Sequence, residues 1–169
     1  IKEALQDLAG QSAALHSQGL VHYFRNNYAV ARPCLEQAAA IRERIGDQAG
    51  AIWSHMYLGM INFMQGEYSE AIRHNVRALQ ASEARQDWFQ MGIHLTNAGR
   101  ISLRLGEYEK ALGQLEQSLE MKTRVGDRMG QGFTHYAMGL ANYYLGQDDL
   151  AKAAFEKSGS IDSEALVNG

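Results

Sequence analysis

The chain has 169 residues, of which 46% are hydrophobic, enough to bury a core. Its net charge of -3 comes from 16 basic and 19 acidic residues that are interspersed, a pattern that argues against a nucleic-acid or anionic-membrane partner. The single cysteine, Cys34, excludes an internal disulfide framework and fits a reducing compartment, so a cytoplasmic location is expected.

Four series of residues recur at a spacing of 40 over the whole chain. They are Gly19, Gly59, Gly99 and Gly139; Ala31, Ala71, Ala111 and Ala151; Asp7, Asp47, Asp87 and Asp127; and Tyr28, Tyr68 and Tyr108, with Asp148 in fourth place. Several residue types in one phase indicate a repeat array, whose core is a continuous row.

Residues 1–10 align with residues 41–50, so 1–7 are expected to be the end of a preceding repeat. Four repeats then follow, at 8–46, 47–86, 87–126 and 127–160. Residues 161–169 are either a short capping helix or a tail. We interpret the chain as a fragment of a larger protein.

Each repeat has the pattern of two amphipathic helices. In the second repeat Asp47 is a good N-cap, and a helix is predicted from about 48 to 65. Gly66 can end it in the left-handed conformation, as Gly106, Gly146 and Asn26 can in the other repeats. The second helix is predicted over about 68–85. The connectors are short, so neighbouring helices must be antiparallel.

Small residues mark the seam between the two helices of a repeat. Gly59 and Ala71 face each other across the turn, and Ala78 extends the row by a heptad. A larger side chain here would overpack the seam, so Ala111→Leu is expected to lower the melting temperature.

Two sites depart from the pattern. Pro33 falls inside the predicted second helix of the first repeat, where it is expected to kink that helix or delay its start. Gly159 and Ser160 are expected to break the last helix.

The motif formed by Leu58, Gly59, Gly66, Tyr68 and Ala71 resembles the tetratricopeptide repeat. The 40-residue period and the Gly-Asp connectors at Gly46 and Gly126 are similar to those of its long-helix subclass. The resemblance covers essentially the whole chain and implies an all-α, right-handed superhelical solenoid of helix-turn-helix units. Three residues after the motif glycine the family usually has an aromatic residue, but this chain has His22, Asn62, Ser102 and Asn142. A bulky residue of the second helix is replaced by Asn75 in the second repeat. These residues either loosen the packing or mark polar seams.

The resemblance also implies that the first helices line a concave groove. The corresponding residues in the second to fourth repeats include Trp53, Met56, Met60, Phe63, Met64, Thr96, Arg100, Arg104, Phe133, Tyr136, Leu140, Tyr143 and Tyr144, together with Ile93 and Leu103. The first repeat contributes Ala13, His16, Leu20, Tyr23 and Phe24. Methionine and aromatic side chains suit an amphipathic helix or an extended peptide. Alternatively, many of them pack against adjacent helices.

Arg100 and Arg104 are spaced i,i+4, so both can meet a ligand carboxylate or pair with local acidic residues. A clamp for the carboxylate tail of a chaperone is not supported, because of the five polar positions of that clamp only Arg100 matches.

Metal and catalytic sites find little support. His55 and His135 share one phase but stand 80 residues apart, and the sequence contains no HExxH and no CxxC motif. Cys34 is expected to be a packing residue. If it were a catalytic nucleophile it would need a base, and His16 and His22 are the only loose candidates. Gly130 and Gly132 are not followed by the Lys-Ser/Thr pair of a phosphate loop.

The sequence therefore predicts a non-catalytic protein–protein interaction module without a cofactor. It would bind a peptide or helix of a protein partner within a multidomain regulatory or signalling protein. The alternative is a switch domain of a bacterial transcriptional regulator, ATPase or cyclase that senses a ligand or signalling peptide. Self-association through an exposed end of the solenoid is also expected, because terminal repeats need polar caps.

Overall fold

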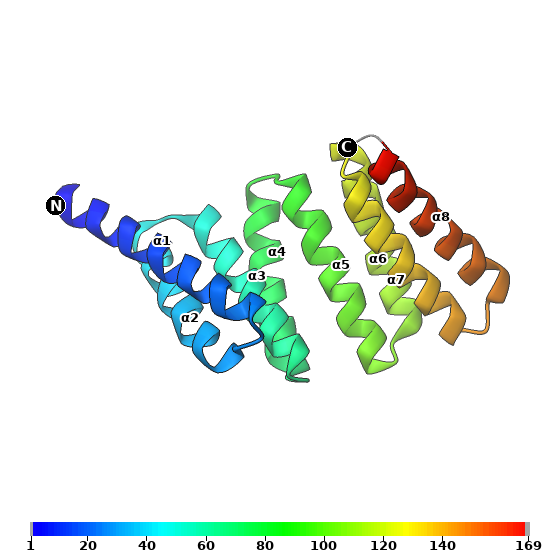
Figure 1. Ribbon diagram of the computed structural model, residues 1–169, viewed down its shortest axis with the longest axis horizontal. Helices are drawn as coiled ribbons and strands as arrows, with labels where there is room; N and C mark the ends of the chain where they lie inside the picture. The colour runs from blue at the N-terminus through cyan, green and yellow to red at the C-terminus, as the bar shows by residue number, and fades with distance from the viewer. Residues whose placement is uncertain (1, 168–169) are drawn as a thin grey trace. The chain divides into compact units, whose positions relative to one another are not determined.

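The computed structural model describes residues 2–167, with side chains described over 7–160. Over this range the structure consists of eight α-helices without a strand (Figure 1). The helices are α1 (Lys2–Phe24), α2 (Tyr28–Ile45), α3 (Gln48–Met64), α4 (Tyr68–Ala84), α5 (Trp88–Leu105), α6 (Tyr108–Val125), α7 (Arg128–Tyr144) and α8 (Asp148–Val167). The all-α prediction of helix-turn-helix units is confirmed.

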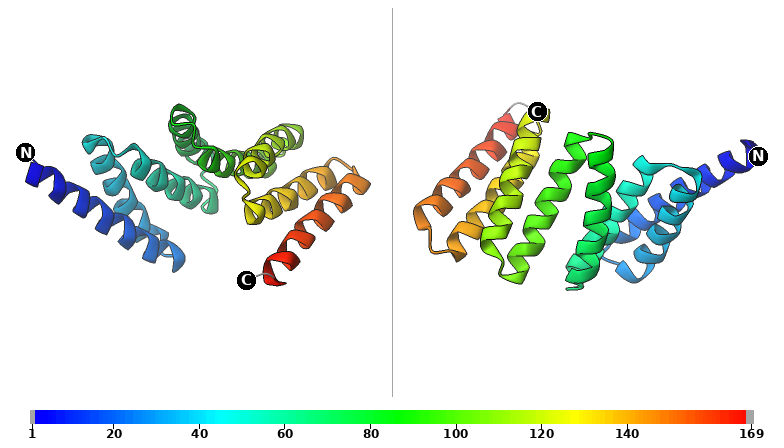
Figure 2. Two further views of the ribbon diagram at one scale, coloured as in Figure 1. Left: turned by 90° about the horizontal axis from the view of Figure 1, so that it is seen from above. Right: turned by 180° about the vertical axis from the view of Figure 1, so that it is seen from behind.

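The chain forms two compact units, Ile1–Ala81 and Ser82–Gly169. The first contains α1 to α3 and most of α4, and the second contains the end of α4 and α5 to α8. Connectors of two or three residues join the helices into hairpins, as Figure 2 shows within each unit. In the second unit α7 packs against α6, α8 and α5.

The helix ends follow the predicted signals. Asp47, Asp87 and Asp127 each accept a hydrogen bond from the backbone N–H three residues later, at 2.9, 3.1 and 2.9 Å. The expected left-handed residues have positive φ, including Gly66 at 77° and Asn26 at 57°. These caps satisfy amides and carbonyls that the helices leave unpaired, and they fix the short turns.

The small-residue seam is fully closed. Ala31, Ala71 and Ala111 are each 0% exposed, and Ala151 is 3% exposed. A methyl group added at Gly99 would lie 2.6 Å from Leu115 Cγ, whereas one added at Gly59 would find its nearest atom at 3.5 Å. The Leu115 side chain therefore fills the space beside Gly99, whereas Gly59, which holds the same place in the repeat, leaves room for a methyl group.

The expected late start of the helix that contains Pro33 and the expected break at Gly159 were wrong. Helix α2 begins at Tyr28 and continues through Pro33 to Ile45. Pro33 is exposed and removes only one amide donor, while the flanking Ala31 and Leu35 are 0% exposed and anchor the helix on both sides. Helix α8 likewise continues through Gly159 to Val167, since a helical glycine costs only about 1 kcal/mol relative to alanine.

The remaining differences lie at the two ends of the chain. Helix α1 runs without interruption from Lys2 to Phe24, so no turn separates residues 2–7, expected to end a preceding repeat, from the first helix of the next repeat. Of the segment 161–169, the part up to Val167 belongs to α8, and residues 168–169 lie outside the described residues.

Candidate interaction surface

One face of α7 presents large apolar and aromatic side chains to solvent. We call it the α7 stripe, and it consists of Met129, Phe133, Tyr136, Leu140, Tyr143 and Tyr144. Leu140 is half-buried, and the other five are 54–65% exposed. Their i, i+3, i+4 and i+7 spacings gather them on one side of a helix with 3.6 residues per turn. Helix α7 thus has a second apolar face besides the one that packs into the fold.

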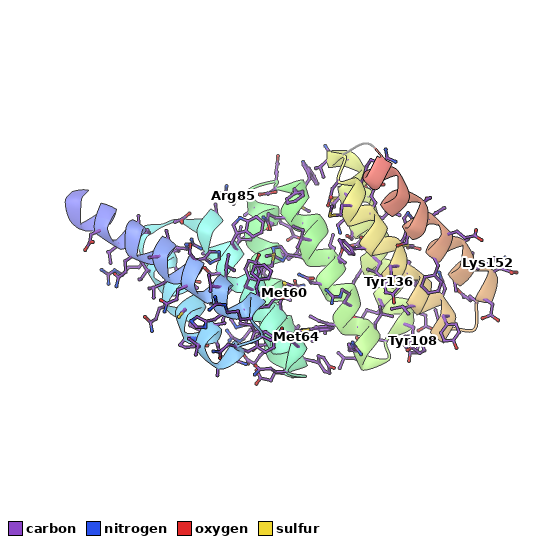
Figure 3. The ribbon with its side chains drawn as sticks, in the orientation of Figure 1. Met60, Met64, Arg85, Tyr108, Tyr136 and Lys152 are labelled. Carbon is purple, nitrogen blue, oxygen red and sulfur yellow. The ribbon has the colours of Figure 1, made fainter. Side chains whose placement is uncertain are left out.

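Neighbouring helices hold the rings of this stripe. Tyr144 stacks on Tyr108 at the start of α6, with ring centroids 5.0 Å apart and planes 13° apart. Tyr136 lies 5.7 Å from the ring of Phe155 on α8. Figure 3 marks Tyr108 and Tyr136. Rings fixed in this way lose little conformational entropy on binding, which favours their use as anchors.

Helix α5 lies beside α7 and supplies the basic residues. The Thr96 and Thr134 hydroxyl oxygens are 3.2 Å apart and join the two helices. Arg100 and Arg104 follow Thr96 by one and two turns, and both are exposed. In the repeat they hold the phases of Leu140 and Tyr144, so the guanidinium groups and the stripe belong to corresponding faces of α5 and α7.

The structure places two of the predicted groove residues in the interior. Thr96 is 7% exposed and Met56 is 8% exposed. The Thr96 hydroxyl already meets Ser118, Thr134 and Lys122, because α6 covers it. Neither side chain is offered to a ligand.

In the first unit the predicted residues are spread over α3. Met64 is 58% exposed and Trp53 is 37% exposed, while Met60 and Phe63 are half-buried. Met60, marked with Met64 in Figure 3, has its sulfur 3.9 Å from the Tyr23 hydroxyl of α1. For these residues, and for the α7 stripe, ligand binding stays a prediction.

A buried lysine that the sequence analysis missed joins three helices of the second unit. Lys122 of α6 is 3% exposed, and its Nζ donates to Thr96 Oγ1, Thr134 Oγ1 and the Gly130 carbonyl oxygen at 2.9–3.1 Å. Burial lowers the pKa of Lys122 to about 8, and the nearby Asp127 carboxylate opposes that shift. Three acceptors match the three donors of an ammonium group, so the charge is satisfied without a ligand.

Arg42 occupies the same place in the first unit, 80 residues earlier. It is 9% exposed, and its Nη1 donates to the Gly50 carbonyl oxygen at 2.8 Å and to Ser54 Oγ at 2.9 Å. Gly50 and Ser54 correspond to Gly130 and Thr134. A comparison at a spacing of 80 would have found this pair, because the intervening position is Ser82.

Histidines form a buried hydrogen-bonded chain in the first unit. His55 Nε2 lies 2.8 Å from Glu43 Oε1, and His55 Nδ1 lies 3.1 Å from His74 Nδ1. A carboxylate only accepts, so His55 Nε2 donates to Glu43, and the Nδ1 of neutral His55 accepts from His74. His74 Nε2 is then the acceptor for Arg73 Nη2 at 3.3 Å.

Neither a cluster of metal ligands nor a membrane-spanning helix is found among the described residues. Among the side chains of 7–160, no group of three or more His, Cys, Asp or Glu is placed to hold a metal ion. None of the helices in the described part of the chain has the length and apolar character needed to span a bilayer.

The profile of the tetratricopeptide repeat family matches residues 10–84 and 90–163, most of the chain. Among solved structures, BtubC (BKLC) from P. vanneervenii is similar over 94% of this chain, with a TM-score of 0.81 and 16% identity. This chain spans 65% of the length of that protein. The MamA protein is similar over 94% of this chain and 95% of its own, with a TM-score of 0.53 and 18% identity. No curated protein sequence matches the chain. These likenesses show the fold, and the family profile supports a protein-interaction module.

Proposed function

We propose, since the chain belongs to the tetratricopeptide repeat family, that it is a non-catalytic module that binds a peptide or helix of a partner protein on the exposed face of its first helices. In this proposal it serves a larger regulatory or signalling protein. The observation that carries the proposal is the α7 stripe, in which five large apolar or aromatic side chains are more than half exposed on one helix face. A contiguous exposed apolar surface of this kind usually marks an interaction site.

The composition of the stripe fits a protein ligand. Tyrosine offers a large contact area with few rotatable bonds, and methionine adapts to different partner shapes. The spacing of the stripe along α7 suits the apolar face of an amphipathic helix or the alternate side chains of an extended peptide.

The test is affinity capture from a lysate of the source organism with the whole chain as bait. The variant Phe133→Glu/Tyr143→Glu places two charges in the stripe, and we expect it to lose partners that the wild type retains. Leu150→Glu is the matched control, because Leu150 is 57% exposed but lies on the second helix α8. Equal retention by all three chains would refute binding through the stripe.

A small-molecule sensor would give a different result in a thermal melt. Its ligand would raise the melting temperature by mass action at sub-millimolar concentration, whether or not the stripe is intact. Stabilisation by a metabolite together with unchanged protein capture would therefore replace the proposal with the sensing-switch alternative.

A further inference from the structure

The α7 stripe occupies the side on which a first helix receives the next first helix. The equivalents of Phe133, Tyr136 and Tyr143 on α5, 40 residues earlier, are Ile93, Thr96 and Leu103. On α5 these positions are half-buried or buried, and the Thr96 hydroxyl oxygen lies 3.2 Å from that of Thr134 on α7. On α7 the same positions are 54–65% exposed. The stripe therefore presents a surface of the kind that takes another helix.

The spacing of the stripe also indicates a helix. Along α7 the steps between successive stripe residues are four, three, four and three, from Met129 to Phe133, Tyr136, Leu140 and Tyr143. This is the heptad pattern by which one helix packs its side chains between those of a second helix. An extended peptide, whose side chains alternate along a strand, has no such period.

The stripe is nearly symmetric about its centre. Met129 and Tyr143 lie seven residues on either side of Tyr136, which is marked in Figure 3. Phe133 and Leu140 lie three and four residues from it. If two copies of α7 pack antiparallel, Met129 of one copy meets Tyr143 of the other. Phe133 likewise meets Leu140, and the two Tyr136 rings meet at the twofold axis. Each contact then occurs twice, as a twofold interface requires.

Charge does not oppose such a pairing. Between Met129 and Tyr144 the chain contains no Asp, Glu, Lys or Arg. His135 in this segment is half-buried, and burial lowers its pKa, so it is neutral at pH 7. Two antiparallel α7 helices therefore bring no like charges together along the stripe.

The exposed area is large enough for a dimer. Five stripe side chains are 54–65% exposed. Large side chains of this kind bury about 150–250 Å² each, so one copy offers roughly 450–750 Å². A twofold pair buries about twice that area, which reaches the size of about 1,000–1,200 Å² at which specific interfaces begin.

We propose that two copies of this chain associate through the α7 stripe, with their α7 helices antiparallel and Tyr136 on the twofold axis. The large side chains of both stripes leave water together, which supplies the driving force. The inference goes beyond the proposed function, since the dimer needs no other protein. A partner that binds the stripe must displace the second copy, so dimerisation sets how much of the stripe is open to that partner.

Sedimentation equilibrium of the whole chain over a range of micromolar concentrations tests the proposal. We expect the wild type to approach twice the mass of one chain as the concentration rises. Phe133→Glu/Tyr143→Glu should weaken the dimer at least about 100-fold, because a pair would bury four unpaired carboxylates.

Val76→Glu/Leu150→Glu is the matched control. It adds the same two carboxylates at side chains that are 44% and 57% exposed. Their equivalents in the third repeat, Glu116 and Lys110, are charged and exposed, so these positions tolerate charge. We expect the control to dimerise as the wild type does. A circular dichroism melt of each variant checks that the fold is intact.

A cysteine on the twofold axis tests the arrangement of the two copies. Cys34 is the one cysteine of the chain and is buried. Under mild oxidation Tyr136→Cys should form a disulfide between two copies, whereas Leu150→Cys should not, because only the former brings two cysteines within reach. Gel electrophoresis without reductant separates linked from single chains.

Several results would overturn the proposal. A wild type that stays monomeric would do so, as would a dimer that the stripe variant leaves intact or that the control also loses. A dimer in which Tyr136→Cys forms no link would contradict the twofold arrangement. Capture of a partner through the stripe is measured separately, so the failure of either idea can be told from that of the other.

Discussion

Gly99 of α5 lies directly against the side chain of Leu115 on α6. A methyl group there would meet the buried Leu115 at 2.6 Å, so we expect Gly99→Ala to lower the free energy of unfolding by about 1–3 kcal/mol. Gly113 on α6 is the control, because a methyl group there meets no atom within 4 Å. Gly113→Ala should raise stability by about 0.5–1 kcal/mol. Urea denaturation of both variants measures the difference, and a stabilising Gly99→Ala would contradict this reading of the seam.

His74 should make the fold sensitive to acid. Burial, with a contribution from the neighbouring His55, lowers the pKa of His74 to about 4 from 6.5. The unfolded chain therefore binds a proton at higher pH than the folded chain does. The contribution of neutral His74 to stability is complete above pH 6.5 and is lost as the pH falls towards 4.

The prediction is best tested by a difference between two proteins, because burial also lowers the pKa of His16 and His94 to about 4. His74→Asn keeps a side-chain N–H donor for His55 but does not titrate. Urea unfolding at several pH values between 4 and 7 should show a shallower loss of stability for this variant. Parallel curves for the two proteins would rule out His74 as a source of the acid sensitivity.

At the scale of the helix, Pro33 is a local defect that packing overrides. Pro33→Ala restores an amide donor in α2, and a proline inside a helix costs up to about 3 kcal/mol relative to alanine. We expect this variant to be more stable, by less than that full amount because alanine frees the unfolded chain. Pro33→Gly restores the same amide but should gain about 1 kcal/mol less. Thermal melts compare the three chains, and a less stable Pro33→Ala would mean that the proline suits its site.

The helices themselves were largely predictable from sequence, since their signals are local. Asp47 and Gly66 act on the turn in which they stand, and a 40-residue spacing places the same turns in every repeat. The expectation for Pro33 failed because packing holds α2 in place despite the proline. The expectation for Gly159 failed because a glycine inside a helix costs little stability.

The interior was less predictable, because burial depends on residues distant in sequence. Thr96 is covered by Ser118 and Lys122 of α6, and no local pattern shows this. The chain from Glu43 through His55 to His74 joins three helices in the same way. The family resemblance named every residue of the α7 stripe except Met129, but only the structure shows which groove positions are exposed.

Across the whole molecule, a repeat protein gains its stability from each repeat and its nearest neighbours. Pro33 and Gly99 lie in different compact units. We expect the effects of Pro33→Ala and Gly99→Ala on the free energy of unfolding to add within about 0.5 kcal/mol in the double variant, as for distant sites that share no partner. Urea denaturation of the two single variants and the double variant measures this, and a larger deviation would reveal coupling between the units.

The buried cations Arg42 and Lys122 bear on how the repeat array evolved. They recur at a spacing of 80 residues, with Ser82 at the intervening position. Duplication of a gene segment that encoded two hairpins would produce this spacing. Recombination should then lengthen or shorten such a chain in steps of two hairpins. If residues 48–87 alone were lost, the helix of Arg42 would be followed directly by α5. His94 would then take the place of Ser54, and Arg42 would lose its hydrogen bond to that serine.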